Sequence, residues 1–252
     1  IKKDLRARDI TINSIAIDIL KKEIVYLDNA LKDLEKGVIK DNKYKGIISS
    51  LAIDALRIYR IARQAAQLGF TVSYTTGNHM HYYKNNLDTV APERVYEEFK
   101  KALASDNPER FFYVLEESDC LDNYFYEFSK LWYKTQPITH HPEIYVHEHF
   151  IQSLKLLKEY KDDLYFRFAV LMHDIGKGLT KSKELPHHYT HTKDGIESLK
   201  NFADKVPIPN KWYKAAEIAI TEHQRIKNWK KMSPGKVVRL FKKIERSVIS
   251  IQ

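Results

Sequence analysis

The chain has 252 residues, which is enough for one large domain or two smaller ones with separate cores. Hydrophobic residues make up 43% and charged residues 30%, and no apolar run has the length of a membrane span, so composition excludes a membrane protein. A net charge of +9 indicates a polyanionic partner, and the single cysteine, Cys120, excludes an internal disulfide and fits a reducing cytoplasm.

The first predicted elements are two strands between residues 10 and 27. β-branched and apolar residues run from 10 to 20, a polar turn follows, and a second apolar run covers 24–27. This pattern predicts a β-hairpin, and because an isolated hairpin is only marginally stable we expect it to belong to a sheet whose other strands are missing from this sequence. Residues 50–68 predict a helix, with Ser49 or Ser50 as its N-cap and Gly69 at its end.

Helices are predicted through the rest of the chain, at residues 92–104, 107–116, 122–133, 146–160, 164–175, 192–203, 210–223 and 234–245. Pro234 is a typical first residue for the last of these helices. The chain contains only 8 glycines and 8 prolines, which favours a mainly α-helical fold with short connections. The stretch 134–142, which contains two of the prolines, is the best candidate for a linker.

The second half of the sequence contains one His-Asp pair with widely spaced histidines around it, a pattern that indicates a metal site. A divalent cation needs several imidazole or carboxylate ligands, and a helical protein supplies them from separate helices. His188 lies three residues before His191, and we expect one of them to ligate or to contact phosphate, with His191 favoured because it precedes the helix that carries Gly195. The expected metal ligands are His149, His173, Asp174, His191 and His223.

A lysine between two glycines follows the His-Asp pair. Glycines let the backbone approach a bound anion, and Lys177 can neutralise a phosphate charge. The expected catalytic residues are therefore His173, Asp174 and Lys177. The alternative interpretation is a buried, hydrogen-bonded His-Asp pair without a cation. Ligand type does not choose among Mg, Mn, Ni and Co, all of which are compatible with this set.

Two basic stretches are candidates for binding a polyanion. Residues 225–246 hold nine basic residues against Glu245 alone, and RNA is the expected partner, although a solvated lysine-rich face is an equal alternative. In the helix predicted at 50–68, Asp54 and Arg57 are three apart, with Arg60 and Arg63 continuing the row. Spacing alone favours a simple ion pair between Asp54 and Arg57. The alternative hypothesis is that the paired donors of an arginine and the carboxylate recognise the edge of a nucleotide base.

These stretches together resemble a known family. The sequence of residues 170–178 resembles the motif of the HD superfamily of metal-dependent phosphohydrolases. Arg8, Asp9, Thr11 and Asn13, followed by Asp54 and Arg57, resemble motifs of the class II tRNA nucleotidyltransferases, the CCA-adding enzymes and their poly(A) polymerase relatives. The chain departs from those motifs at Ala7, where an arginine is usual, and at Ile53, where a glutamate is usual. The resemblance to bacterial CCA-adding enzymes with an appended HD domain covers nearly the whole chain.

The resemblance implies a mainly α fold in three parts. Residues 1–46 would be a remnant of the nucleotidyltransferase head with a short β-hairpin, 47–136 a helical neck and body, and 137–252 a helical HD domain. It implies tRNA and the nucleotides ATP and CTP as partners, a cytoplasmic location, and either a homodimer or association with a separate head. The nucleotide-binding residues that it implies are Arg8, Asp9, Asn13, Asp54, Arg57, Arg60 and Arg63.

The implied function is tRNA 3′-end maturation by a family member whose HD domain hydrolyses phosphate esters or 2′,3′-cyclic phosphates with a divalent metal. The family's catalytic carboxylates precede the first motif that this sequence carries, so we expect no nucleotide addition by this chain alone. Two alternatives remain open: an inert tRNA-binding fragment, which Ala7 and Ile53 favour, and a free-standing HD nucleotidase, which the basic C-terminal segment disfavours.

Overall fold

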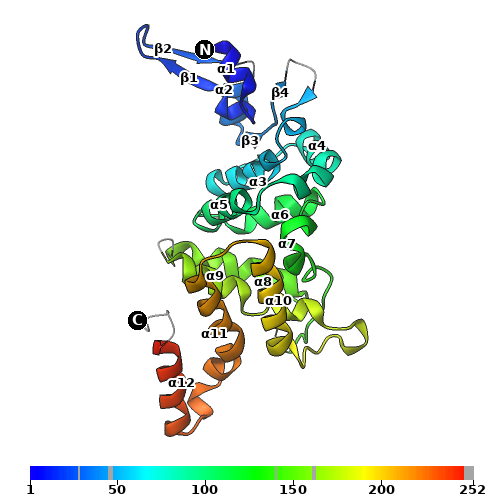
Figure 1. The fold of residues 1–252 in the computed structure, drawn as a ribbon, viewed down its shortest axis with the longest axis vertical. Coiled ribbons are helices and arrows are strands. Elements are labelled where there is room, and N and C mark those ends of the chain that lie inside the picture. The colour runs from blue at the N-terminus through cyan, green and yellow to red at the C-terminus, as the bar shows by residue number, and fades with distance from the viewer. Residues whose placement is uncertain (28, 45–47, 140, 161–162, 247–252) are drawn as a thin grey trace. The chain divides into compact units, whose positions relative to one another are not determined.

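The computed structural model describes residues 1–27, 29–44, 48–139, 141–160 and 163–246, and most of them are helical (Figure 1). The chain divides into two compact units, unit 1 at Ile1–Asn123 and unit 2 at Tyr124–Gln252. The mainly α fold class is therefore confirmed. The predicted boundary between residues 46 and 47 lies outside the described residues, and the division into three domains stays a prediction.

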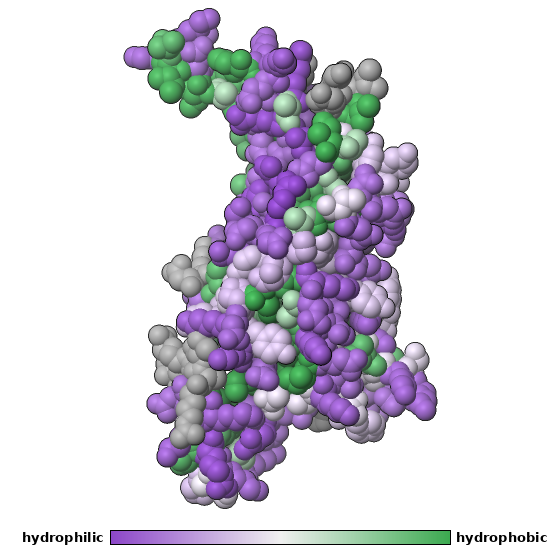
Figure 2. Space-filling model, in the orientation of Figure 1, coloured by the Kyte–Doolittle hydropathy of each residue, from purple (hydrophilic) through white to green (hydrophobic). Residues whose placement is uncertain are grey.

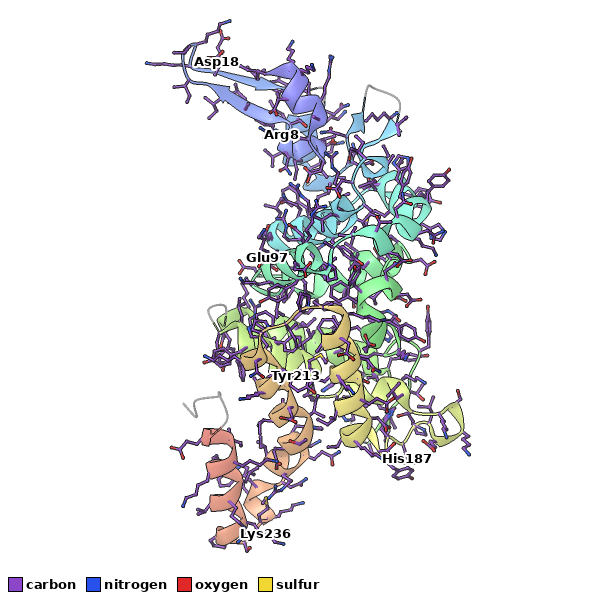
Figure 3. All side chains as sticks on the ribbon, in the orientation of Figure 1. Arg8, Asp18, Glu97, His187, Tyr213 and Lys236 are labelled. Atoms are coloured by element: carbon purple, nitrogen blue, oxygen red, sulfur yellow. The ribbon has the colours of Figure 1, made fainter. Side chains whose placement is uncertain are left out.

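The predicted hairpin is present in unit 1, although it starts later than the sequence indicates. β1 (Ile15–Asp18) pairs antiparallel with β2 (Glu23–Tyr26). The Asp18 carboxylate, labelled in Figure 3, accepts the turn N–H groups of Leu20 and Lys21 at 3.1 Å each. The strand predicted at residues 10–12 is wrong, because the Asp9 carboxylate accepts the Ile10 N–H at 3.0 Å and Thr11–Asn13 form a 3-10 turn, η1.

The predicted helix at 50–68 begins six residues late. The Ser49 hydroxyl accepts the Leu51 N–H and caps a separate 3-10 turn, η2 (Ser50–Ala52), so the long helix α3 covers Leu56–Leu68. Gly69 ends α3 as predicted, with the left-handed φ of 70° that glycine adopts without strain. Asp54 therefore lies before the helix rather than on its face.

The other helices of unit 1 are α1 (Lys2–Ala7), α2 (Ala30–Glu35), α4 (Tyr74–Tyr83), α5 (Pro92–Leu103) and α6 (Glu109–Glu117), with η3 at Lys84–Thr89. The sequence predicted α5 and α6 but missed α1, α2 and α4. Its short strands pair as β3 (Val38–Ile39) with β6 (Thr71–Val72) and β4 (Lys43–Tyr44) with β5 (Ile48–Ser49). α3 packs on α5 and α6 through aromatic contacts such as Tyr59 on Phe111, with ring centroids 6.4 Å apart.

Unit 2 is a set of helices around an aromatic core. Its elements are α8 (Val146–Lys155), η4 (Leu156–Tyr160), α9 (Leu164–Met172), η5 (Ile175–Leu179), η6 (Ser182–Glu184), α10 (His191–Lys205), α11 (Asn210–Lys227), η7 (Trp229–Lys231) and α12 (Pro234–Arg246); α7 (Asp122–Ser129) begins at the division between the units. Phe168 of α9 contacts Trp212 of α11 and Phe202 of α10, with centroids 5.2 and 6.0 Å apart. α9 is apolar apart from Tyr165 and the buried Arg167, and its residues are buried or half-buried among its neighbours.

A close backbone approach joins η5 to the start of α10. A Cβ atom added at Gly176 would lie 2.0 Å from the His191 carbonyl oxygen and 2.3 Å from the Gly195 nitrogen. Only glycine fits there, so the two glycines let the residues that follow α9 meet the first turn of α10. None of the helices in the described part of the chain combines the length and apolar character needed to cross a bilayer.

We expect Gly176→Ala to destabilise unit 2 by about 3 kcal/mol or more, because backbone atoms rather than a flexible side chain must move. Denaturant unfolding followed by tryptophan fluorescence measures this loss. Gly235→Ala is the control, since nothing lies within 4 Å of its added Cβ and alanine favours the helix. Equal stability of the two variants would contradict the close approach.

Cys120 should be unreactive in the folded chain. Its side chain is buried, and burial raises the pKa of its thiol to about 12. The unfolded thiol ionises near pH 8.5, so this cysteine lowers the stability of unit 1 as the pH rises above that value. At pH 8 we expect iodoacetamide to spare the native protein and to alkylate it in guanidinium, as mass spectrometry would report; rapid native alkylation would disprove the burial.

Candidate metal centre

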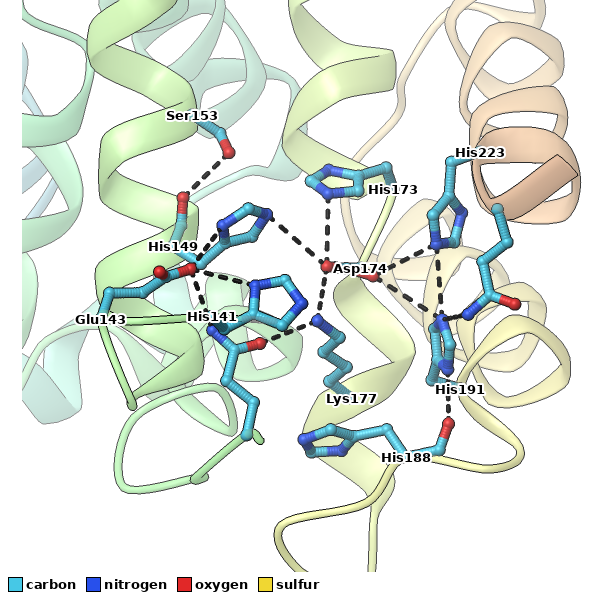
Figure 4. A network of polar contacts seen from close by, with 12 residues as sticks. His141, Glu143, His149, Ser153, His173, Asp174, Lys177, His188, His191 and His223 are labelled. Atoms are coloured by element: carbon cyan, nitrogen blue, oxygen red, sulfur yellow. Dashed lines mark hydrogen bonds and ion pairs between the residues drawn. The ribbon is translucent and has the colours of Figure 1, made fainter. Parts of the chain in front are cut away.

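Four histidines of unit 2 converge on one carboxylate (Figure 4). Asp174 Oδ2 lies 3.3 Å from His173 Nε2 and 3.8 Å from His149 Nε2. Its other oxygen, Oδ1, lies 3.4 Å from His223 Nε2 and 3.7 Å from His191 Nε2. Asp174 is 12% exposed and sits between the end of α9 and the start of η5, so separate elements bring these nitrogens to both sides of one buried group.

Three of these rings are oriented by backbone carbonyl groups of their own segments. The Nδ1 atom lies 2.7 Å from Val170 O in His173, 2.5 Å from His188 O in His191, and 3.1 Å from Ala219 O in His223. A carbonyl oxygen only accepts, so Nδ1 must carry a proton, and in the neutral form of each ring Nε2 has the lone pair. Each Nε2 is therefore ready to ligate a cation.

The fourth ring, His149, is oriented by a side chain. Its Nδ1 lies 2.8 Å from Glu143 Oε1, which His141 Nδ1 also approaches to 3.1 Å. Ile144 follows Glu143 with a φ of 59°, a left-handed conformation that a β-branched residue adopts only at a cost of about 1–3 kcal/mol. The backbone is thus strained next to the carboxylate that faces His149.

A buried lysine completes the centre. Lys177 Nζ lies 2.7 Å from Asp174 Oδ2 and donates to Gln136 Oε1 at 2.9 Å. Gln136 in turn donates from Nε2 to Glu143 Oε1 at 3.2 Å. Lys177 is only 5% exposed, so its ammonium group lies at the carboxylate rather than in solvent.

The surrounding charges keep Asp174 ionised. Burial alone would raise its pKa, but the charge and hydrogen bond of His173 together with Lys177 hold that pKa well below 3.8. Burial opposes protonation of His173, yet Asp174 raises its pKa above 6.5. Burial lowers the pKa values of His149 and His223, which favours the neutral imidazoles that metals bind.

Two nearby histidines are held in structural contacts. His188 Nδ1 lies 2.7 Å from the Thr180 hydroxyl and His188 Nε2 lies 3.0 Å from Thr135 O, which occupies both ring nitrogens. Burial, with Lys177 nearby, lowers the His188 pKa to about 4. His147 stacks on Trp132 with ring centroids 5.3 Å apart. Of the pair His188 and His191, it is His191 whose Nε2 faces Asp174, at 3.7 Å from Oδ1.

The donor set fits a divalent transition metal. Imidazole nitrogens and a carboxylate suit Mn, Ni, Co or Zn, and a carboxylate with one oxygen toward each pair of histidines can hold one cation or bridge two. Four further residues of the centre were not predicted from the sequence: His141, Glu143, Gln136, and Gln224, whose side-chain nitrogen lies 3.1 Å from His191 Nε2. The run His141-Pro142-Glu143, a carboxylate two residues from a histidine, was the available signal.

In unit 1, the residues proposed to bind nucleotide gather around one loop. Asp9 is buried; its Oδ1 accepts from Asn13 Nδ2 at 3.0 Å and its Oδ2 lies 2.9 Å from Arg60 Nε. Arg8, labelled in Figure 3, donates to Asn13 O at 3.0 Å. Arg57 donates to Ala7 O at 2.9 Å. Arg57 and Arg60 thus meet the segment around Asp9 in the fold, although about fifty residues separate them in sequence.

Two members of the predicted set lie apart from this loop. Asp54 pairs with Arg94, Nη2 to Oδ2 at 2.7 Å, and that hydrogen bond lowers the Asp54 pKa although burial opposes it. The Asp54–Arg57 ion pair suggested by the spacing is therefore wrong, because Asp54 is not in α3. Arg63 is buried against Glu98 and Gln67. The arginine row does not form one open face.

The basic C-terminal segment is exposed. The exposed residues are Arg225, Lys227, Lys230, Lys231, Lys236, Arg239, Lys242 and Lys243, while the side chain of Arg246 lies outside the described residues. Arg225 and Lys243 share Glu222 at 2.7 and 2.6 Å. Leu240 and Ile244 of α12 pack on Ile218 of α11, whereas Val238 and Phe241 of α12 are exposed, as is Lys236 near its start in Figure 3.

Three family models match the chain in order. Residues 1–40 match the poly A polymerase head domain, 69–131 the probable RNA and SrmB-binding site of polymerase A, and 146–247 the HD domain. The HD match covers every expected metal ligand. The motif resemblance seen in the sequence is therefore confirmed.

Relatives and solved structures agree with these models. The chain is 34% identical over 248 residues to the multifunctional CCA protein of Shewanella denitrificans and 34% over 250 to that of Shewanella frigidimarina. Each match spans 96% of this chain but only 59% and 58%, respectively, of the length of the two relatives. Two solved structures share the fold. One is a tRNA nucleotidyltransferase complexed with a primer tRNA and an ATP analog, with a TM-score of 0.62, 20% identity and coverage of 98% of this chain and 66% of that one. The other is a CCA-adding enzyme with ATP, with a TM-score of 0.59, 19% identity and coverage of 100% of this chain and 54% of that one.

The order of the head, RNA-binding and HD matches, the one-third identity along 96% of the chain, and the shared fold all point the same way. The chain is therefore similar to the CCA-adding enzymes along nearly its whole length, and its second half matches an HD domain.

Proposed function

We propose that unit 2 is a metal-dependent phosphohydrolase that acts on phosphate esters of RNA ends or nucleotides, including 2′,3′-cyclic phosphates. The observation that carries this proposal is the convergence of four histidine Nε2 atoms on the two oxygens of Asp174. The ligands would be His149, His173, Asp174, His191 and His223. When bound, the cation would polarise a phosphoryl oxygen and lower the pKa of a water molecule.

The chain's own residues have separate roles in this proposal. Asp174, with its low pKa, stays ionised at neutral pH and is ready to ligate a cation. Lys177 is positioned to neutralise an anionic phosphate once a cation competes for Asp174, since its Nζ already lies at the rim of the ligand set. The imidazole-rich donor set supports Mn, Ni or Co over Mg, because Mg prefers oxygen ligands.

Unit 1 would contribute the nucleotide and tRNA contacts of a CCA-adding enzyme. The cluster of Arg8, Asp9, Asn13 and Arg60 supports a nucleotide-binding role for this loop, with Arg57 holding its backbone at Ala7. Asp54 would act together with Arg94, and Arg63 through its buried pairing. ATP and CTP as substrates, and tRNA as partner, rest on the similarity to CCA-adding enzymes and on the exposed basic segment at 225–246.

We expect His173→Ala and Asp174→Asn each to lower metal-dependent hydrolysis of a 2′,3′-cyclic nucleotide by more than the roughly 10–100-fold cost of losing an outer-shell partner. Each change removes or weakens a ligand, while the asparagine keeps the packing of Asp174. Product formation with Mn, Ni or Co, and metal affinity by calorimetry, measure the effect.

His187→Ala is the matched control, because His187 is an exposed histidine of the same unit that stacks on Tyr189 away from the ligand set. It should retain the activity. Absence of hydrolysis of cyclic phosphates, nucleotides and generic phosphate esters by the metal-loaded protein would rule out the phosphohydrolase.

The exposed lysines and arginine of α12 should bind tRNA with a steep salt dependence. Replacing Lys236, Arg239 and Lys242 together by alanine should lower the slope of log affinity against log salt by about 2–3, because each neutralised phosphate contributes about 0.9. Filter binding at several salt concentrations measures the slope.

An equal charge change on α10, at Lys193, Lys200 and Lys205, is the control and should leave the slope nearly unchanged. The same slope in both triple variants would show that the basic segment only solvates the surface.

A further inference from the structure

We infer that Glu143 is a positioning residue that fixes the tautomer of His149, and this inference rests on the metal centre of the proposed function. Glu143 Oε1 lies 2.8 Å from His149 Nδ1, and the opposite nitrogen of the same ring, Nε2, faces Asp174 Oδ2 at 3.8 Å. A carboxylate that accepts the Nδ1 proton leaves Nε2 unprotonated and makes it a better ligand.

His149 differs from its three companions in what holds its ring. Backbone carbonyl groups hold His173, His191 and His223, and a carbonyl is present whatever the sequence. The ring of His149 instead depends on one replaceable side chain from the segment before α8. Without it, the ring still faces the acceptor Asp174 Oδ2, 3.8 Å from Nε2, so the proton would move to Nε2 and the lone pair that faces the centre would be lost.

The backbone around Glu143 supports the assignment. Ile144 has a φ of 59°, and a β-branched residue persists in that conformation only where its surroundings require it. Gln136, which is 2% exposed, donates to Glu143 Oε1 and accepts from Lys177 Nζ. Glu143 is therefore held in place from a second side, and through Gln136 it is linked to the lysine assigned to phosphate.

A cation bound between His141, Glu143 and His149 is the other use of this geometry. Their ligand atoms lie close enough to share one ion. The positioning role is favoured because a metal on His149 Nδ1 would compete with the use of Nε2 of that ring at Asp174. The two uses differ in the number of ions bound, so the same experiment separates them.

The test compares Glu143→Ala and Glu143→Gln with Glu148→Ala. Glutamine keeps an acceptor oxygen for His149 Nδ1 but removes the charge. Glu148 is the carboxylate beside His149 on α8 and forms no ion pair among the described residues, so it is a matched control. Mn and Ni titrations by calorimetry give affinity and stoichiometry, and two-bond proton–nitrogen NMR spectra of the metal-free protein report which nitrogen of His149 is protonated.

We expect Glu143→Ala to weaken metal binding by about 10–100-fold with unchanged stoichiometry, and to shift the His149 proton toward Nε2. Saturating metal should restore most of kcat, so the loss lies in the metal concentration required. Glu143→Gln should keep the proton on Nδ1 and lose less affinity, and Glu148→Ala should match the wild type. The glutamine variant decides the question if the alanine variant does not fold.

Two results would overturn the inference. One is a Glu143→Ala protein with the wild-type His149 tautomer and an affinity within about threefold. The other is the loss of one bound ion per chain, which would make Glu143 a ligand. If the wild-type protein binds metal but hydrolyses no phosphate ester, the proposed function fails, whereas the affinity and tautomer measurements still decide the role of Glu143.

Discussion

The buried carboxylate of Asp174 is the group on which the architecture of unit 2 depends. An ionised carboxylate is costly to bury unless cations or hydrogen-bond donors surround it. Here Lys177 Nζ lies 2.7 Å from it and His173, whose pKa Asp174 raises, places Nε2 at 3.3 Å, while the Nε2 atoms of the other three histidines lie 3.4–3.8 Å away. Those partners come from α8, the end of α9, η5, α10 and α11, so the helices must pack in one arrangement for the charge to be compensated.

Helix ends and backbone carbonyl groups position most of the side chains of the metal centre. His173 and Asp174 lie in the break between α9 and η5, and His191 is the first residue of α10. Backbone carbonyls orient three of the rings without further side chains, and the contact between Gly176 and the first turn of α10 brings His191 within reach of Asp174. A site built this way tolerates surface variation but not added volume at the glycine.

Unit 1 uses its charged residues differently. The buried Asp9 joins Asn13 and Arg60, and Arg63 is enclosed with Glu98, so these arginines stabilise the loop and the helix packing as well as offering charge. Arg8 and Arg57 donate to backbone oxygens of the same loop region. Ligand contacts there would need donors beyond those already used, which the forked guanidinium groups retain.

The sequence by itself determined the mainly α fold, the hairpin, most helices of the second half and the family resemblance, because hydrophobic periodicity, caps such as Gly69 and Pro234, and short motifs are local patterns. It also identified the histidines and Asp174, since chemistry-bearing residue types are visible without coordinates. Tertiary structure alone decided that Asp54 pairs with Arg94, that His188 is held by Thr180 and Thr135, and that Glu143 faces His149. These contacts join segments distant in sequence or depend on the direction in which a ring or a strained backbone points, and no periodic pattern records that direction.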